Sequence, residues 1–308
     1  MSEIRICMVG SAMTDLIARV PRLPAPGETL IGSSFRIGFG GKGSNQAVMA
    51  ARLGAKVSVV VKLGKDVFGE NYLQNYKDQG INTDFVFFDE DRSSGVAPIT
   101  VDDTSGQNSI VIVPGANDSL CSEDVQKAKS AITEAHVVIC QLETPLEASL
   151  EAFKIARENQ ALTILNPAPA RDLPDEILEL TDIFAPNEVE AAMLSGQSIE
   201  KLEDAKQVAQ ALLKRGPKHV IITLGDKGAV FVSQGGEAKV HQAEQVKAVD
   251  TTGAGDAFVG SLAYFLGADW ALEKAVARAC DLATLSVQKP GTQTSYPYRK
   301  EVLNLLEG

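Results

Sequence analysis

The residues best suited to do chemistry lie in the segment Asp250-Thr-Thr-Gly-Ala-Gly-Asp256, which opens an apolar helical stretch over Ala257–Leu266. Small residues at a helix start leave backbone N–H groups open, and the positive end of the helix dipole favours negative charge there. A carboxylate beside such an anion site suits a general base in phosphoryl transfer. We therefore predict Asp256 as a catalytic base and an anion hole formed by Gly253, Ala254 and Gly255. A plain capping aspartate in a glycine-rich loop would show the same pattern.

A second glycine-rich segment, Gly38-Phe-Gly-Gly-Lys-Gly-Ser-Asn45, runs into a helix expected over Ser44–Leu53. Its glycines let the backbone approach a ligand closely, and Lys42 and Asn45 could hydrogen-bond hydroxyl groups. The segment also matches the dinucleotide pattern G-x-G-x-x-G, but the stretch before it is rich in proline and does not read as a strand of a βαβ unit. A glycine-rich turn that caps a helix is the simplest alternative.

Two further motifs follow apolar strand-like runs. Asn187-Glu-Val-Glu190 places an amide and carboxylates where they suit a Mg²⁺–phosphate water network, and it also fits a capped helix start with Asn187 as cap and Glu190 as its partner. Thr223-Leu-Gly-Asp-Lys-Gly228 ends a strand in a glycine turn, which suits either a nucleotide contact or the start of a hairpin.

The elements that must position these motifs alternate between short apolar runs and helix-length amphipathic segments. This alternation predicts an α/β fold with a doubly wound, mostly parallel sheet flanked by helices, in which ligands gather at the carboxyl ends of the strands. The expected strands are Ile4–Val9, Val57–Leu63, Val137–Gln141, Leu162–Asn166, Ile183–Ala185 and Val220–Leu224. The other expected helices are Glu70–Gln79, Ser122–Ile132, Leu146–Asn159 and Glu200–Arg215.

Two stretches break this alternation and predict a small β-sheet lid. Residues 16–39 are rich in proline and β-forming residues, and residues 95–113 read as two strands around the turn Asp102–Gly106. Two ordinary surface hairpins are the alternative. A sheet this small needs a covering partner, which a symmetric dimer through the lids would provide.

Composition excludes several classes of protein. The 308 residues carry 29 Lys and Arg against 40 Asp and Glu, so the net charge of −11 argues against a nucleic-acid partner. No apolar run approaches the ~20 residues of a membrane span. The four widely spaced cysteines indicate a reducing, intracellular setting, and the three histidines lack zinc-ligand spacing. We expect a cytoplasmic protein, with the nucleus possible in a eukaryote.

Together the motifs resemble the PfkB family of sugar kinases and, within it, the ribokinases. The order and spacing of Gly40–Ala47 and Asp250–Asp256 carry the resemblance, and Gln141-Leu-Glu143 and Asn166–Ala170 agree with it. The resemblance covers essentially the whole chain and implies one kinase domain over 1–308 that dimerises through its lid. It also implies ATP-dependent transfer of a phosphoryl group to the 5-hydroxyl of D-ribose, with Mg²⁺ and with K⁺ as monovalent activator.

The resemblance further implies roles for individual residues. Those at the sugar are Met13, Asp15, Gly41, Lys42, Gly43, Asn45, Glu143 and Asp256. Those at the nucleotide are Asn187, Glu190, Thr223, Gly225, Gly228, Gly255 and Cys280. Those at the monovalent cation, several acting through backbone carbonyls, are Asp250, Thr252, Ser286, Lys289, Gly291 and Ser295.

Two positions depart from the usual pattern of these kinases. Met13 stands where many bacterial ribokinases have asparagine, so one hydrogen bond to the sugar is lost, and Cys280 replaces the more usual histidine or asparagine on the adenine side. Three alternatives stay open: a PfkB kinase for another sugar or a nucleoside, a catalytically silent sugar-binding sensor, and an NAD-dependent dehydrogenase built on Gly38–Gly43. The retained Asp256 and its anion hole argue against the sensor.

Overall fold

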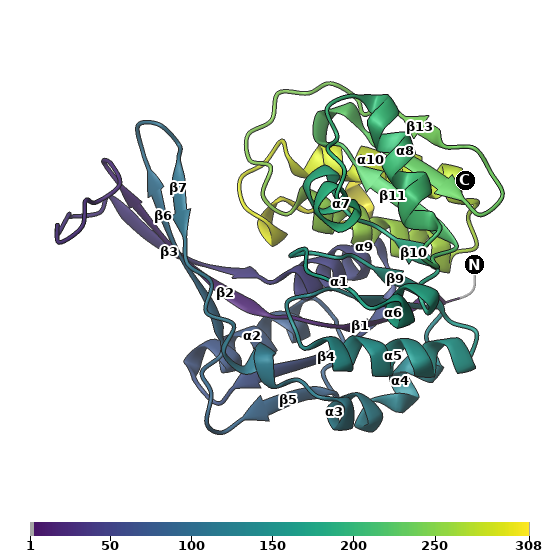
Figure 1. Ribbon diagram of the computed structural model, residues 1–308. Helices are drawn as coiled ribbons and strands as arrows, with labels where there is room; N and C mark the ends of the chain where they lie inside the picture. The colour runs from purple at the N-terminus through teal and green to yellow at the C-terminus, as the bar shows by residue number, and fades with distance from the viewer. Residues whose placement is uncertain (1–2, 308) are drawn as a thin grey trace.

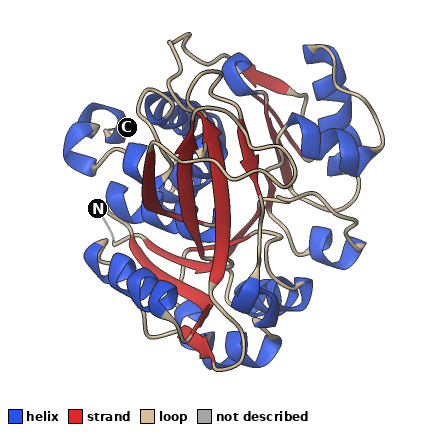
Figure 2. Cartoon of the chain, turned by 90° about the vertical axis from the view of Figure 1, so that its left-hand side faces the viewer, coloured by secondary structure: helices blue, strands red, loops and turns tan. Residues whose placement is uncertain are grey.

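A nine-stranded sheet forms the centre of the computed structural model, which describes residues 3–307 (Figures 1 and 2). Its strands lie in the order β13-β12-β11-β10-β9-β8-β1-β4-β5, and all neighbours from β11 to β5 are parallel, whereas β12 and β13 add an antiparallel edge. The predicted fold class is confirmed. The strands are β1 Arg5–Val9, β4 Lys56–Gly64, β5 Val86–Asp89, β8 Val137–Cys140, β9 Leu162–Leu165, β10 Ile183–Phe184, β11 His219–Thr223, β12 Ala229–Ser233 and β13 Lys239–His241.

Helices cover both faces of this sheet, and the strand sequences show why. Successive side chains of β1 alternate between two buried clusters, with Ile6 and Met8 in one and Cys7 and Val9 in the other, so both faces must be apolar. The first cluster is covered by α1 Lys42–Leu53, α2 Val67–Asp78, α9 Ala254–Gly267, α10 Leu272–Ser286 and α11 Leu303–Leu306. The second is covered by α3 Ser122–Lys127, α4 Lys129–Thr133, α5 Leu146–Glu158, α6 Asp175–Glu179, α7 Glu188–Ser195 and α8 Leu202–Leu213.

Some elements differ from the prediction. The helix expected over Ser122–Ile132 is divided into α3 and α4 at Ala128. Helix α2 begins earlier than expected because the Asp66 carboxylate caps it, accepting a hydrogen bond from the N–H of Gly69 at 2.9 Å. Strands β5 and β13 and helices α6, α10 and α11 were not predicted, and β12 follows the turn for which a hairpin was one of two alternatives. Within residues 3–307, no helix has the length and apolar character needed to cross a membrane.

A second, four-stranded sheet stands apart from the first and projects from the body of the molecule (Figure 1). We call it the lid sheet; its strands are β2 Met13–Val20, β3 Ser34–Gly40, β6 Gly95–Asp102 and β7 Asn108–Ile110. The small second sheet is therefore confirmed, and it begins earlier than expected, at Met13. Strand β2 joins the two hairpin segments, because it pairs antiparallel with β3 and parallel with β6. Several of its apolar side chains are exposed, among them Phe35, Ile37 and Ile110.

Candidate active site

Three neighbouring cavities lie at the carboxyl ends of the parallel strands. The smallest, of about 150 Å³, holds the side chains with the strongest chemistry and shares lining residues with a larger cavity of about 390 Å³. A third, of about 310 Å³, opens toward the lid sheet. We call them the transfer, nucleotide and sugar pockets, after the roles argued below.

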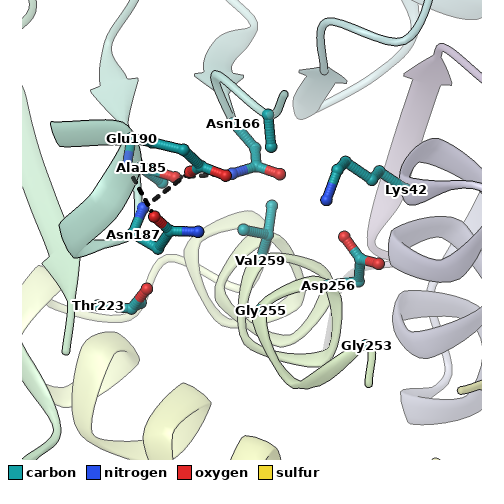
Figure 3. Close-up of a pocket in the computed structure, with 11 residues that line it drawn as sticks. Lys42, Asn166, Ala185, Asn187, Glu190, Thr223, Gly253, Gly255, Asp256 and Val259 are labelled. Atoms are coloured by element: carbon teal, nitrogen blue, oxygen red, sulfur yellow. Dashed lines mark hydrogen bonds between the residues drawn. The ribbon is translucent and has the colours of Figure 1, made fainter. Parts of the chain in front are cut away.

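The transfer pocket brings together residues that are far apart in the sequence. Lys42 from α1 and Asp256 from α9 point into the same space, and Asn166, Asn187 and Glu190 approach it from the strand ends (Figure 3). The close approach of α1 and α9 makes this possible, because a Cβ atom at Gly260 would lie only 2.4 Å from the backbone oxygen of Gln46. Gly260 is one turn beyond Asp256, so both face α1.

Asp256 is 7% exposed, and both of its carboxylate oxygens accept hydrogen bonds from amide side chains of α1. The Asn45 amide donates to Oδ2 at 2.9 Å, and the Gln46 amide donates to Oδ1 at 3.0 Å. Burial raises the pKa of Asp256 above its ordinary value, although the Lys42 ammonium and the two amides oppose this effect. A carboxylate held in this way can accept a proton from a hydroxyl in the pocket.

The start of α9 provides an anion site beside this carboxylate. Gly253 caps the helix with a φ of 79°, a left-handed conformation that favours glycine. The Tyr296 hydroxyl holds this turn by donating to the Gly253 carbonyl at 2.9 Å. The N–H of Ala254 donates to Thr251 O at 3.2 Å, so this predicted donor of the anion hole is already engaged. Among the described residues, no backbone acceptor is found for the N–H groups of Gly253, Gly255 and Asp256, and all three residues line the transfer pocket.

Lys42 supplies the positive charge of the transfer pocket. Burial alone would lower the pKa of its ammonium group, but the carboxylates of Asp256, Glu143 and Glu190 outweigh that effect and raise the pKa. Lys42 therefore stays protonated and is available to a phosphate oxygen.

The sugar side of the site contains two partly buried carboxylates, Glu143 and Asp15. Glu143 accepts hydrogen bonds from the backbone N–H of Lys42 at 2.8 Å and from the Ser11 hydroxyl at 2.6 Å. The Asp15 carboxylate lies against Gly40, where a Cβ atom would come within 2.6 Å of it. Burial, together with the charge of Glu143, raises the pKa of Asp15 to about 6, and Arg36 opposes the shift.

Other predicted sugar residues lie close by. Gly41 has a φ of 86°, and a Cβ atom there would lie 2.8 Å from the N atom of Met13. Met13 and Glu143 line the sugar pocket, and Gly43 and Asn45 lie in the first turn of α1. The glycine at position 41 thus lets the start of α1 lie against β2. The predicted sugar residues nevertheless divide between two cavities, because Met13 and Glu143 line the sugar pocket whereas Lys42 and Asp256 line the transfer pocket.

The nucleotide pocket gathers six of the seven residues predicted at the nucleotide. It is lined by Asn187, Thr223, Gly225, Gly228, Gly255 and Cys280, together with apolar side chains such as Phe258 and Val287. The hairpin alternative for Thr223–Gly228 is also correct, because β11 and β12 pair antiparallel across it. One turn therefore both closes a hairpin and lines the cavity.

Glu190, the seventh, lies in the transfer pocket instead. It forms the predicted capping box of α7, in which its carboxylate accepts from Asn187 N at 2.8 Å and Asn187 Oδ1 accepts from Glu190 N at 2.8 Å. Within residues 3–307, no three acidic, histidine or cysteine side chains gather into a metal cluster. Mg²⁺ often keeps several waters and binds through one carboxylate plus substrate phosphates, and Glu190 fits that mode.

The segment predicted to hold a monovalent cation is assembled around Asp250. Its carboxylate accepts hydrogen bonds from Gly291 N at 2.9 Å and from the N and hydroxyl of Thr252 at 3.0 and 2.6 Å. Burial alone would raise the pKa of Asp250, but these hydrogen bonds lower it overall. An ionised carboxylate suits a cation, and the K⁺ site at this segment stays a prediction.

The remaining predicted ligands of this cation can contribute only in part through their side chains. The Lys289 ammonium lies 3.8 Å from the Glu301 carboxylate, so only the backbone of Lys289 suits a cation. The hydroxyls of Ser286 and Ser295 donate to Ala283 O at 2.7 Å and to Thr292 O at 2.8 Å. Each hydroxyl oxygen keeps its lone pairs free.

Three buried amides at the site were given no role in the sequence analysis. Gln46, Asn166 and Gln293 are 0%, 8% and 5% exposed. Gln46 donates a hydrogen bond to Asp256 directly, Asn166 is connected to it through Gln46, and Gln293 through Asn45. Gln46 lies in Gly40–Ala47 and Asn166 in Asn166–Ala170, two segments that carry the family resemblance. That position was the only sign in the sequence that they belong to the site. Their connection to Asp256 joins distant parts of the chain and depends on tertiary packing.

Comparisons with known proteins agree with this geometry. The model of the pfkB family of carbohydrate kinases matches residues 3–299. Ribokinase of Mus musculus is 49% identical over 301 residues, which cover 96% of this chain and 93% of the mouse protein. Deoxyribokinase of Salmonella typhi is 40% identical over 293 residues and covers 95% of each chain.

A solved structure extends the comparison to the fold. Arabidopsis thaliana ribokinase complexed with ribose and ATP superposes with a TM-score of 0.91 at 31% identity and covers 99% of both chains. The fold, the arrangement of the site and the family match over nearly the whole sequence agree with one another. The chain therefore belongs to the pfkB family of carbohydrate kinases.

Proposed function

We propose that this protein is an ATP-dependent ribokinase that converts D-ribose to D-ribose 5-phosphate. The observation that carries the proposal is the position of Asp256 and the start of α9 in the transfer pocket, which shares lining residues with the larger nucleotide pocket. On the other side, Glu143 of the sugar pocket accepts a hydrogen bond from the backbone of Lys42, which lines the transfer pocket. A sugar hydroxyl and a γ-phosphate entering from opposite sides would meet at this point. Ribokinases at 49% and 39% identity support the choice of substrate.

In this proposal Asp256 takes the proton from the 5-hydroxyl as the oxygen attacks the γ-phosphate. Backbone N–H groups of Gly253 and Gly255 and the Lys42 ammonium stabilise the charge on the transferred oxygens. Asp15, Glu143 and Asn45 hold the other sugar hydroxyls, with the backbone of Gly41 and Gly43 close by.

The nucleotide is held by the residues that line its pocket, with Glu190 and Asn187 at the phosphate end. Mg²⁺, when bound, neutralises phosphate charge, and Glu190 would hold it through water. K⁺ would bind at the Asp250 segment and preorganise the start of α9, which begins four residues later.

A second substrate, 2-deoxy-D-ribose, is favoured by a specific observation. Met13 lines the sugar pocket with a side chain that makes no conventional hydrogen bond, and a deoxyribokinase is 40% identical to this chain. A pocket that lacks one hydroxyl partner discriminates less strongly against the deoxy sugar. We therefore infer that both pentoses are phosphorylated and that ribose is preferred.

The oligomeric state and the location complete the proposal. Exposed Phe35, Ile37 and Ile110 on the lid sheet suit a homodimer in which two lids cover each other. Light scattering at micromolar concentration should give twice the mass of one chain, and a single-chain mass would contradict the dimer. All four cysteines are free thiols, which fits a cytoplasmic location.

Replacing Asp256 with asparagine tests the central residue of this proposal. The substitution keeps the shape but removes the proton acceptor, so kcat for ribose phosphorylation should fall by about 10² or more while ribose affinity changes little. The readouts are ribose-dependent ADP release and ribose binding by calorimetry. Near-normal turnover would remove Asp256 from the role of base.

A further inference from the structure

A chain of buried amides runs from the strand ends to the carboxylate of Asp256. Gln46 Nε2 donates both to Asp256 Oδ1 and to Asn166 Oδ1, each at 3.0 Å. Gln46 Oε1 in turn accepts from Gln141 Nε2 at 2.7 Å. Gln46 and Gln141 are fully buried, and neither lines any of the three cavities described above. These two glutamines therefore contact other protein groups rather than a ligand.

The groups at the two ends of this series of amides determine the direction of each hydrogen bond in it. Asn166 Nδ2 donates at 2.8 Å to the carbonyl of Ala185, which can only accept, so Asn166 Oδ1 must be the acceptor for Gln46. Asp256, when ionised, is also only an acceptor. Gln46 must therefore present its amide nitrogen to both, and its oxygen is left for Gln141. A flipped Gln46 amide would place an oxygen against the carboxylate.

The position of Gln141 requires glycine at two nearby positions. A Cβ atom at Gly10 would lie 2.0 Å from Gln141 Oε1, and one at Gly43 would lie 2.7 Å from the same atom. The oxygen itself is buried and has no hydrogen-bond partner. Leaving a buried amide oxygen without a partner costs free energy, so we expect the Gln141 side chain to serve a purpose that outweighs this cost. Its only hydrogen bond among the described residues is the one to Gln46.

We propose that Gln46 is a positioning residue for Asp256 and that Gln141 holds the Gln46 amide in its donor orientation. Gln46 fixes Oδ1, so that the carboxylate faces the hydroxyl to be deprotonated and remains ionised. Asn45 does the same for Oδ2, and its own oxygen accepts from Gln293 Nε2 at 3.1 Å. This inference rests on the proposed function, because it assumes that Asp256 is the base.

The pH dependence of kcat at saturating ribose distinguishes positioning from mere packing, whereas kcat/KM would also report the free enzyme's Asp15, whose pKa is raised to about 6. Lys42 from α1, Glu143 after β8, Glu190 in α7 and Tyr296 near the chain end are the titratable groups whose charges act on Asp256 or respond to it. All four are unchanged in a Gln46 variant. A shift of the acid limb would therefore report the loss of the Gln46 donor.

The test uses Gln46→Met, which keeps the length of the side chain and removes its polar atoms. We expect kcat to fall about tenfold and the acid limb of kcat to move up by about one pH unit, while the Kd for ribose stays within about threefold. Gln141→Met should move both quantities in the same direction but less, and the double variant should be no worse than Gln46→Met alone.

Thr163→Val is the matched control for buried polar loss. Thr163 lies on β9, the strand that leads to Asn166, and its hydroxyl donates to Leu180 O at 2.7 Å. Thr163→Val should lower the free energy of unfolding without shifting the acid limb of the pH profile. If Gln46→Met does not fold, Gln141→Met decides the question by the same two readouts.

An unchanged acid limb in the folded variants, with or without a lower kcat, would overturn the positioning role. Asp256→Asn, measured alongside, separates the hypothesis that Asp256 is the base from the hypothesis that Gln46 positions it. If Asp256→Asn retains turnover, the proposed base itself is wrong. If Asp256→Asn loses turnover but the glutamine variants keep the pH profile of the wild type, Asp256 remains the proposed base and the positioning role of Gln46 is wrong.

Discussion

Replacing Asp15 with asparagine should raise the free energy of unfolding of the protein while strongly lowering its activity on sugars. Asp15 is a mostly buried carboxylate on β2, and within residues 3–307 no hydrogen bond to it is found. Its natural partners in the proposed function are the hydroxyls of the sugar. Without the sugar, the charge is therefore held in an unfavourable environment.

The size of this effect follows from the pKa of Asp15. Burial, with the charge of Glu143 in support, raises the pKa from an ordinary 3.8 to about 6. The difference of about two units corresponds to about 3 kcal/mol, by which the ionised carboxylate lowers the free energy of unfolding at neutral pH.

Because the pKa of Asp15 is raised, the free energy of unfolding depends on pH over a definite range. Between pH 3.8 and 6 the folded protein binds more protons at Asp15 than the unfolded chain does, so stability falls as pH rises through this window. Asp15→Asn removes that dependence. The variant should exceed the wild type in free energy of unfolding by about 1 kcal/mol at pH 4.5 and by about 3 kcal/mol at pH 8.

Urea unfolding at the two pH values measures these differences, and Asp84→Asn, at an exposed aspartate, is the matched control. In parallel, kcat/KM for ribose should fall by about 10² in Asp15→Asn, because charge-assisted hydrogen bonds to the sugar are lost. A variant less stable than the wild type at pH 8, or a stability difference independent of pH, would refute the reasoning.

Three other predictions follow from single contacts. Gly260→Ala should lower the free energy of unfolding by about 2 kcal/mol and reduce kcat as well, because its Cβ atom would push α9 away from Gln46; unchanged urea midpoint and kcat would contradict this. K⁺ should raise the rate above that in Li⁺ at equal ionic strength, and Asp250→Ala should abolish the difference; equal rates in the wild type would exclude the cation as an activator. Met13→Asn should raise kcat/KM for ribose over that for 2-deoxyribose by about tenfold, and an unchanged ratio would show that residue 13 does not contact the sugar.

Local chemistry explains what could be predicted from the sequence. The helix start at Gly253 and the capping box of Asn187 and Glu190 depend on neighbouring residues, so their patterns are visible without a structure. The buried strands were found because both faces of a central parallel sheet must be apolar. Strand β13 has only three residues at an edge, so its pattern is too short to detect.

Tertiary packing explains what could not be predicted. The role of Gln46 depends on α9 crossing α1 at Gly260, a contact between residues more than two hundred positions apart in the chain. The side chain of Lys289 faces Glu301 rather than Asp250, which spacing does not reveal. Strand β2 begins at Met13 because Met13 pairs with both Gly40 and Gly95, two long-range partners.

The most direct test of the proposed function is ADP release by the purified protein with ATP, Mg²⁺ and K⁺ over a panel of D-ribose, 2-deoxy-D-ribose, D-fructose and adenosine. D-ribose should give the highest kcat/KM, 2-deoxy-D-ribose should follow, and phosphorus NMR should place the phosphate on O5 of the product. A higher kcat/KM for fructose or adenosine, or no ADP release with any member of the panel, would contradict the assignment as a ribokinase.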